Sequence, residues 1–285
     1  MQSLKKIKTD LKNRKLYAKH DLGQHFLLDE YTIRLIVTAL DIQSDDTLVE
    51  IGSGTGQLTQ FIWNKGHQFT AIEKDHAMVE LLLERYPAIQ ILEEDILEVK
   101  AQFWNSLTPP VKVVGNLPYY ITTPILEQLV LNAELFNRII VMVQAEVAQR
   151  ITAKPVNKSF GRLSLFLQNR FEITVIKQVS GRHFYPQTQV RSTVLQLIPR
   201  TQPLVPASLT ETFEHLAKAI FTSRRKNILN SLTRYPYFKP IESQIGTQLQ
   251  TCDIDPRTRG ETLSFEKLIE LAQTLKSSLT PGGKI

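Results

Sequence analysis

The chain has 285 residues, of which 42% are hydrophobic, and a formal net charge of +6. This length and composition allow a large buried core and favour one large domain with a smaller one. They predict neither a membrane-spanning segment nor a secretory signal, because the sequence has no long apolar run. The single cysteine, Cys252, has no disulfide partner and no neighbouring metal ligands. It therefore excludes a disulfide scaffold, predicts no metal site and favours a reducing, cytoplasmic setting.

The positive charge is concentrated in two segments. Residues 1–26 and residues 200–240 each carry a net charge of +5, whereas the rest of the chain carries −4. Two basic segments around a mildly acidic body indicate contacts with phosphates, and therefore a nucleic acid partner. For the first segment, a tail that only keeps the protein dissolved is the alternative.

Strands and helices alternate through most of the chain. Residues 1–20 form a lysine-rich basic arm, and Asp29 can then cap a helix whose apolar positions recur at helical spacing. Strands are predicted at residues 47–51, 69–72, 89–92, 111–115, 139–143, 171–176 and 193–198. Helices are predicted at about 57–64 and 76–85, from residue 123 onward, and after the strand at 139–143 through about residue 150. Pro124 is expected at the first position of the helix that opens at residue 123. This alternation predicts an α/β fold on a doubly wound, mostly parallel sheet.

Beyond residue 199 the pattern changes to helices alone. Three prolines between Pro199 and Pro206 indicate a linker. Helices are expected at about 210–221, 226–233 and 264–276. The sequence therefore predicts three parts, which are a basic arm at residues 1–20, an α/β domain at 21–203 and a smaller all-α domain at 204–285.

Residues 116–119, Asn-Leu-Pro-Tyr, directly follow a buried-strand run. They are expected at the carboxyl end of a strand, where open α/β sheets bind ligands. The carboxamide of Asn116 and the carbonyl of Leu117 can accept hydrogen bonds from the exocyclic amine of a base, while Tyr119 stacks on its face. Pro118 stiffens the turn because it fixes φ. An ordinary strand-to-loop turn is the alternative, since Asn and Pro are common in turns.

A glycine-rich turn, Glu-Ile-Gly-Ser-Gly-Thr-Gly at residues 50–56, follows the first strand. Its G-x-G-x-G spacing differs from the dinucleotide fingerprint, and it resembles the S-adenosylmethionine-binding motif of class I methyltransferases. Glu73 ends the second strand, where a carboxylate can accept both ribose hydroxyls. Asp95 follows the third strand and can accept a hydrogen bond from the adenine amine, with Ile96 against the ring. Each acid can instead be an ordinary solvated loop charge.

Several motifs occur together in an order known from one family. They are Asp-Leu-Gly-Gln-His-Phe-Leu at residues 21–27, the glycine-rich turn, Asn-Leu-Pro-Tyr-Tyr-Ile-Thr-Thr-Pro at 116–124, Phe-Gly-Arg-Leu-Ser at 160–164 and Phe-Thr-Ser-Arg-Arg-Lys-Asn-Ile-Leu-Asn-Ser-Leu at 221–232. The chain resembles the ribosomal RNA adenine dimethyltransferases, most closely the KsgA (RsmA) type, from about Ala18 to Leu275. The last motif favours the small-subunit enzymes over the Erm enzymes, which act on large-subunit RNA.

The resemblance implies a Rossmann-like class I methyltransferase domain with a helical carboxyl-terminal domain. The protein is expected to be a cytoplasmic monomer. It implies transfer of methyl groups from S-adenosylmethionine to two adjacent adenines, in a hairpin near the 3′ end of small-subunit (16S) ribosomal RNA, during subunit assembly. The cofactor positions that it implies are Gln24, His25, Leu27, Glu50, Gly52, Ser53, Gly54, Glu73, Lys74, Asp95, Ile96 and Asn116.

The same resemblance implies the residues that hold the target base and the RNA. The base is expected between Tyr119 and Phe184, at the segment Asn116, Leu117 and Pro118. Phe184 can instead be a core aromatic near a sheet edge. Arg224, Arg225 and Lys226 open a predicted helix and are expected to bind RNA, unless they only form a solvated helix face.

The chain departs from the family pattern in two places. His25 stands where many relatives have Asn, which still leaves a polar group there. The run Gln-Thr-Gln-Val-Arg-Ser at residues 187–192 lacks the usual proline-lysine pair and carries Arg191 where an acid is common.

Other functions are compatible with the same fold. An Erm-type enzyme would modify large-subunit RNA, and a non-catalytic ribosome assembly or transcription factor would keep the fold without the chemistry. A DNA amino-methyltransferase is disfavoured, because the chain has no sizeable extra region to read DNA sequence. The intact tetrapeptide at residues 116–119 argues against lost chemistry, since a pure binder has no evident need for it.

Overall fold

The computed structural model describes residue 9 and residues 24–279. The basic arm at residues 1–20 and the first three residues of the motif at 21–27 therefore lie outside the described residues, apart from residue 9. Within the described part, no helix is long and apolar enough to cross a membrane.

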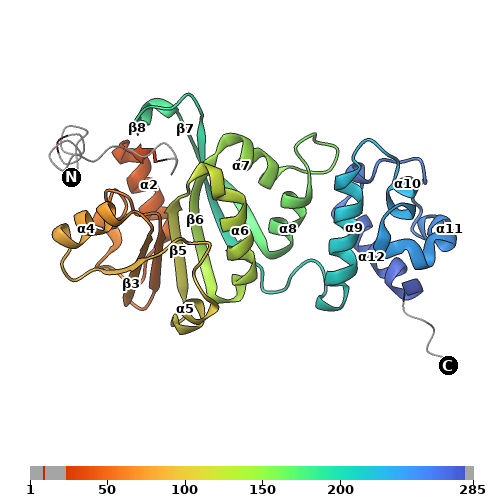
Figure 1. Cartoon of the computed structure of the whole chain (residues 1–285), viewed down its shortest axis with the longest axis horizontal. Helices are drawn as coiled ribbons and strands as arrows, with labels where there is room; N and C mark the ends of the chain where they lie inside the picture. Colours follow the sequence, from red (N-terminus) through yellow and green to blue (C-terminus); the bar gives the residue numbers. More distant parts are fainter. Residues whose placement is uncertain (1–8, 10–23, 280–285) are drawn as a thin grey trace. The chain divides into compact units, whose positions relative to one another are not determined.

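The central element of the fold is a twisted sheet (Figure 1). It has seven strands in the order β4-β3-β2-β5-β6-β9-β7. Its strands are β2 (Thr47–Ile51), β3 (Gln68–Glu73), β4 (Gln90–Glu93), β5 (Val111–Asn116), β6 (Phe136–Gln144), β7 (Phe171–Val179) and β9 (Ser192–Pro199). The pairs from β4 to β6 are parallel, whereas β9 pairs antiparallel with both β6 and β7. The expected mostly parallel sheet is therefore confirmed.

Helices alternate with these strands along the chain, as predicted. They are α2 (Glu30–Leu40), α3 (Thr59–Ile62), α4 (His76–Arg85), α5 (Ala101–Ser106), α6 (Thr122–Leu131), α7 (Ala145–Thr152) and α8 (Arg162–Arg170). Asp29 caps α2 as expected, since its side chain accepts from the amide of Thr32. Two details differ from the expectation: α3 is shorter than residues 57–64, and Pro124 is the third residue of α6 rather than the first.

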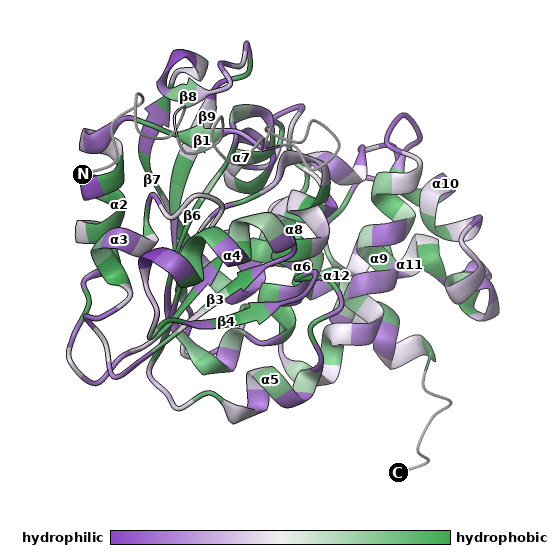
Figure 2. Ribbon diagram, turned by 60° about the vertical axis from the view of Figure 1, so that its left-hand side comes forward, coloured by the Kyte–Doolittle hydropathy of each residue, from purple (hydrophilic) through white to green (hydrophobic). Residues whose placement is uncertain are grey.

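Apolar strands explain why the centre of the sheet is buried. Every residue of β2 is buried, and β5 is buried up to Gly115. Strands covered on both faces read as nearly continuous apolar runs, and the strands of the central sheet are mainly in the hydrophobic colour in Figure 2. The apolar stripe of α2, with Ile33, Ile36 and Leu40, joins the same core cluster as β2 and β6.

A second, two-stranded sheet brings together segments far apart in sequence. The strand β1 (Phe26–Leu27) pairs antiparallel with β8 (Phe184–Tyr185), with Phe26 opposite Tyr185 and Leu27 opposite Phe184. The amide of Leu28 also donates to the carbonyl of His183 at 2.8 Å. Residues 24–28 are therefore anchored next to the segment around residue 185.

The chain divides into two compact units, of which one takes residues up to 148 with 171–200, and the other takes 149–170 with 201–285. The second unit contains α9 (Thr210–Thr222), α10 (Ile228–Thr233), α11 (Ile245–Thr251) and α12 (Phe265–Leu279). Residues 149–170, placed by sequence in the α/β domain, group with these helices instead. The reason is that Phe160 and Leu165 are buried in the helical core cluster, together with Leu209 and Phe213.

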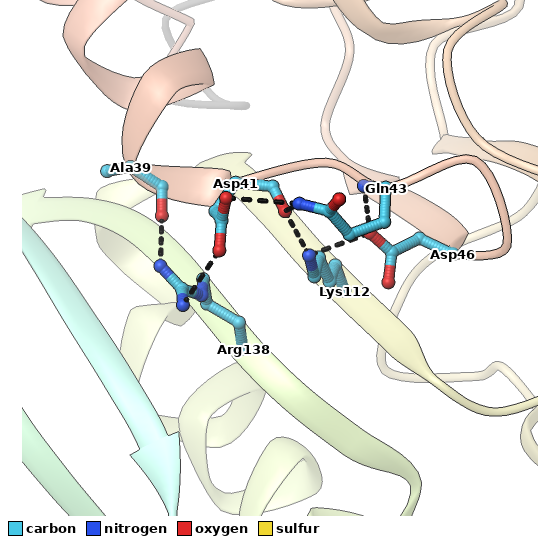
Figure 3. Close-up of polar contacts among 6 residues, drawn as sticks. All are labelled: Ala39, Asp41, Gln43, Asp46, Lys112 and Arg138. Carbon is cyan, nitrogen blue, oxygen red and sulfur yellow. Dashed lines mark hydrogen bonds and ion pairs between the residues drawn. The ribbon is translucent and has the colours of Figure 1, made fainter.

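A buried ion pair lies at the amino-terminal edge of the sheet (Figure 3). Lys112 in β5 is 2.7 Å from Asp46, and their side chains are only 3% and 1% exposed. Lys112 also donates to the carbonyl of Asp41, and the amide of Gln43 donates to Asp46 at 2.6 Å. Arg138 of β6 pairs with Asp41 at 3.3 Å. The cluster fixes the end of α2 to β5 and β6. It lies at the opposite edge of the sheet from the glycine-rich turn at residues 52–56 and the run at residues 116–119.

Candidate functional site

A cavity lies at the carboxyl ends of the parallel strands, as the topology of open α/β sheets requires. It is lined by residues 24–27, 50–54, 57–58, 72–74, 94–96 and 116–121. These segments follow β2, β3, β4 and β5, with the β1 segment as a further wall. All the residues expected around the cofactor line this cavity, and so does the run Asn-Leu-Pro-Tyr at 116–119.

The glycine-rich turn uses backbone conformations that favour glycine. Gly52, Gly54 and Gly56 have φ values of 71°, 52° and 84°, all in the left-handed region. A Cβ added at Gly54 would lie 3.0 Å from the ring of Phe26. The turn therefore stays tight and leaves its backbone open to a ligand, which a larger residue would prevent.

The carboxylate of Glu73 closes the turn from the neighbouring strand. One oxygen accepts from the amide of Gly54 at 2.8 Å, and the other accepts from the amide of Asp75 at 2.9 Å. Burial raises the pKa of Glu73, although these two backbone bonds work in the opposite direction. Each carboxylate oxygen can accept more than one hydrogen bond, so Glu73 keeps acceptor capacity for hydroxyl groups.

Glu50, at the end of β2, is a second buried carboxyl group on the cavity wall. Its carboxylate accepts from the hydroxyl of Thr59 at 2.7 Å. Burial and, to a smaller extent, the nearby charge of Glu73 raise its pKa to about 7, against the hydrogen bond from Thr59. Around neutral pH this carboxyl group is therefore divided between its protonated and ionised forms.

This pKa shift predicts a pH dependence of stability. The folded protein holds the Glu50 proton more tightly than the unfolded chain, whose pKa is 4.5, so stability is lost as the pH rises from about 4.5 to about 7. In Glu50→Gln this contribution is absent. We expect the loss of unfolding free energy between pH 5 and pH 8 to be smaller in the variant by about 2 kcal/mol. Denaturant titrations of both proteins at the two pH values measure this difference, and equal losses would contradict the assignment.

Asp95 lies at the edge of the cavity and is held by two donors. Lys74 is 2.8 Å from one oxygen, and the amide of Leu97 donates to the other at 2.9 Å. Burial raises the pKa of Asp95, but the bonds from Lys74 and Leu97 outweigh it and the pKa lies below its usual value. An ionised carboxylate only accepts hydrogen bonds, which suits an amine donor.

Asn116 lines the cavity and carries an unpaired acceptor. Its Nδ2 donates to the backbone carbonyl of His25 at 2.8 Å. Its Oδ1 is buried and has no hydrogen-bond partner among the described residues. A buried acceptor without a partner costs free energy, and such atoms in native proteins call for an explanation. Here a ligand with an N–H group would satisfy it.

Tyr119 lies beside Asn116 with its ring fixed at two points. Its hydroxyl is 2.7 Å from the hydroxyl of Ser192, at the start of β9. Its ring stacks on the imidazole of His25, with centroids 5.8 Å apart and planes inclined by 27°. The cavity therefore combines an unpaired carboxamide oxygen with an oriented aromatic ring, which is what recognition of an amino-bearing base requires.

A family model described as ribosomal RNA adenine dimethylase matches residues 15–276. The chain belongs to this family. Two relatives are each named ribosomal RNA small subunit methyltransferase A. The protein from Shouchella clausii is 38% identical over an alignment of 278 residues that covers 94% of this chain and 93% of that protein. The protein from Streptococcus pneumoniae is 36% identical over an alignment of 266 residues that covers 90% of this chain and 92% of that protein.

Solved structures share the fold of this rRNA adenine dimethylase. A dimethyladenosine transferase from Plasmodium falciparum superposes with a TM-score of 0.73 at 21% identity, over 89% of this chain and 98% of that one. The 23S rRNA methyltransferase ErmE superposes with a TM-score of 0.66 at 25% identity, over 88% and 99%. The Rossmann-like methyltransferase fold expected from sequence is thereby confirmed, and the chain is an rRNA adenine dimethyltransferase rather than a binding protein without chemistry.

One expected base-stacking residue of the dimethylase lies elsewhere. Phe184 is 1% exposed and belongs to the core cluster that includes Leu27 and Val194. It is not among the residues that line the cavity. The cause is the β1–β8 pairing, which places Phe184 opposite Leu27. Phe184 is therefore a core aromatic residue in this structure, which is the alternative that the sequence leaves open for it.

The three basic residues expected to bind RNA, Arg224, Arg225 and Lys226, differ in their contacts. They lie in the turn between α9 and α10, not at the start of a helix. Arg224 pairs with Glu261 at 2.6 Å and donates to the carbonyls of Lys158 and Phe160 at 3.0 and 2.6 Å. Arg225 and Lys226 are exposed. Arg224 therefore holds the turn, and the other two remain accessible.

Two contacts at the site are not predicted by the sequence. Ser192 holds Tyr119, and the carbonyl of Pro186 lies 2.9 Å from Nδ1 of His25. Both residues lie in or next to the run at 187–192, where the chain departs from its family. Their distance in sequence from Tyr119 and His25 leaves no local signal for these contacts.

Proposed function

We propose that this protein transfers methyl groups from S-adenosylmethionine to the exocyclic amines of two adjacent adenines in small-subunit (16S) ribosomal RNA. The target adenines lie in a hairpin near the 3′ end of that RNA, and the reaction takes place during subunit assembly. The similarity to proteins named ribosomal RNA small subunit methyltransferase A supports the choice of RNA. The observation that carries the chemistry is the unpaired Oδ1 of Asn116 beside the ring of Tyr119.

The residues of the cavity fit S-adenosylmethionine by their chemistry. The glycine-rich turn leaves its backbone open, and Glu73 keeps acceptor capacity for two ribose hydroxyls. Asp95 is ionised and can accept from the adenine amine, while Gln24 and His25 lie on the wall next to Asn116. When bound, S-adenosylmethionine supplies an electrophilic methyl group.

The chain contributes orientation and electrostatics to the reaction. The amine of adenine is a poor nucleophile, because its lone pair is delocalised into the ring. Oδ1 of Asn116 and the carbonyl of Leu117 accept its two N–H bonds, which favours a pyramidal nitrogen with a directed lone pair. Pre-organised acceptors of this kind supply much of the rate in enzymes that act by positioning. A methylated nitrogen that carries positive charge is acidic and releases its proton to water.

Stacking offsets the cost of taking the adenine out of its RNA stack. A base stacked on an aromatic ring is worth about 1–3 kcal/mol. Tyr119 is half-buried, lines the cavity and has its hydroxyl tied to Ser192. We assign the stack to Tyr119. The ring of Phe184 would have to leave the core to form a second stack, so Phe184 supports the β1 wall instead.

RNA binding draws on the exposed basic residues of the helical unit. Arg225 and Lys226 are accessible to phosphates, whereas Arg224 is committed to Glu261 and two carbonyls. We expect Arg225→Gln with Lys226→Gln to weaken RNA binding and to lower its salt dependence by about one unit of slope per phosphate contact. Filter binding between 50 and 300 mM salt measures the slope. An unchanged slope would mean that neither residue contacts phosphate.

Methylation mapping tests the proposed function. Purified protein with labelled S-adenosylmethionine is incubated with small-subunit precursor particles and, separately, with large-subunit RNA. The proposal expects label on two adjacent adenines near the 3′ end of the small-subunit RNA, detected as dimethyladenosine by primer extension and nucleoside analysis. Label on large-subunit RNA alone would identify an Erm-type enzyme and reject the proposal.

A further inference from the structure

The side chain of His25 contacts two parts of the site at once. Its ring lies against Tyr119, with 5.8 Å between centroids and 27° between planes. Its Nδ1 lies 2.9 Å from the carbonyl oxygen of Pro186. The hydroxyl of Tyr119 is tied to Ser192, six residues after Pro186. The two stacked rings are therefore both attached to the segment that enters β9.

The contact with Pro186 fixes the hydrogen on the imidazole. A carbonyl oxygen only accepts, so Nδ1 of His25 must donate. The ring is then either the neutral Nδ1–H form or the imidazolium, and both forms keep this bond. Its orientation against Tyr119 is therefore maintained whichever form is present.

We propose that His25 is a positioning residue for the target base and acts through Tyr119. Its ring lies offset against one face of Tyr119, and the adenine stacks on the opposite face. The three rings then form one stack, and the backing by His25 restricts the motion of Tyr119 relative to Asn116. This inference rests on the proposed function.

The backbone of His25 has a separate task, which makes the role of the ring testable. Its carbonyl accepts from Nδ2 of Asn116, and any residue at this position supplies that carbonyl. The neighbouring residues are held independently: Gln24 donates to Asp75 at 2.9 Å, and Phe26 pairs with Tyr185. Replacing the side chain of His25 therefore removes the stack and leaves the orientation of Asn116 intact.

Two variants separate the ring from the hydrogen bond. His25→Asn removes the ring and keeps a polar group, whereas His25→Phe keeps a ring and removes the donor to Pro186. The interaction free energy of a stacked aromatic pair is large enough to change a rate about three- to tenfold. We expect kcat/KM for RNA to be about three- to tenfold lower in His25→Asn than in His25→Phe. His67→Asn, at an exposed residue outside the cavity, is the matched control.

The readouts distinguish a stack from a cofactor contact. Calorimetric binding of S-adenosylhomocysteine should give the same Kd for His25→Asn and His25→Phe. Three results would each overturn the inference. They are equal kcat/KM values in the two variants, a wild-type kcat/KM in His25→Asn, and a loss in His25→Asn that is matched by weaker binding of S-adenosylhomocysteine.

A readout without turnover separates this inference from the proposed function. A hairpin with 2-aminopurine at the target position reports stacking by fluorescence quenching when it binds. Weaker quenching in His25→Asn than in His25→Phe supports the triple stack, and equal quenching contradicts it. A wild-type protein that binds and quenches this probe but transfers no methyl group to small-subunit RNA would reject the proposed function alone.

Discussion

Asn116→Ala is expected to abolish most methyl transfer and to leave cofactor binding close to that of the wild type. The change removes Oδ1, one of the two acceptors for the adenine amine, and leaves the carbonyl of Leu117 alone. Removing one pre-organised hydrogen-bonding group from an active site costs about 10²–10³-fold in rate. Single-turnover transfer of labelled methyl groups measures the loss, and calorimetry with S-adenosylhomocysteine measures cofactor binding.

A matched variant controls for the loss of a carboxamide as such. Asn132, which follows α6, donates to the carbonyl of Gln128 and does not line the cavity. Asn132→Ala should therefore transfer methyl groups at the wild-type rate. Near-normal turnover of Asn116→Ala would remove the mechanism, because Asn116 is the only described residue of the cavity with a buried carboxamide oxygen that lacks a partner.

Lys112→Met is expected to lower the free energy of unfolding by about 3–5 kcal/mol. Breaking a buried ion pair from one side leaves the other charge without compensation, and this costs more than the pair contributes when intact. Asp46 is 1% exposed and keeps only the amide of Gln43 as a donor in the variant. Denaturant unfolding, followed by circular dichroism, measures the change.

A second substitution shows whether the unpaired charge causes the loss. Asp46→Asn keeps an oxygen for the amide of Gln43 but carries no charge, so adding it to Lys112→Met should recover part of the stability. The pair Arg34–Glu30, 62% and 34% exposed, serves for comparison, and Arg34→Met should cost less than about 1 kcal/mol. If the double variant were less stable than Lys112→Met alone, the buried charge would not be the cause.

The sequence alone determined the order and type of the main elements and the position of the site. Apolar runs such as 47–51 and 111–115 form buried strands of the predicted sheet, because a short apolar run between turns is visible in the local sequence. The parallel topology then requires that the residues after these strands meet at one edge. For this reason the residues expected around the cofactor and residues 116–119 line one cavity.

Only the tertiary structure decided how individual side chains are used. The β1–β8 pairing buries Phe184, and Arg224 is engaged by an ion pair with Glu261. Phe160 and Leu165 likewise group residues 149–170 with the helical unit.

The physical reason is that these outcomes depend on contacts between residues distant in the chain. The amide of Asn116 is oriented by His25, which lies 91 positions earlier, and Tyr119 is held by Ser192, 73 positions later. Local propensity and motif spacing carry no information on which such partners meet. The motif therefore determines which groups reach the cavity, and the packing of distant segments determines which of their atoms remain unpaired.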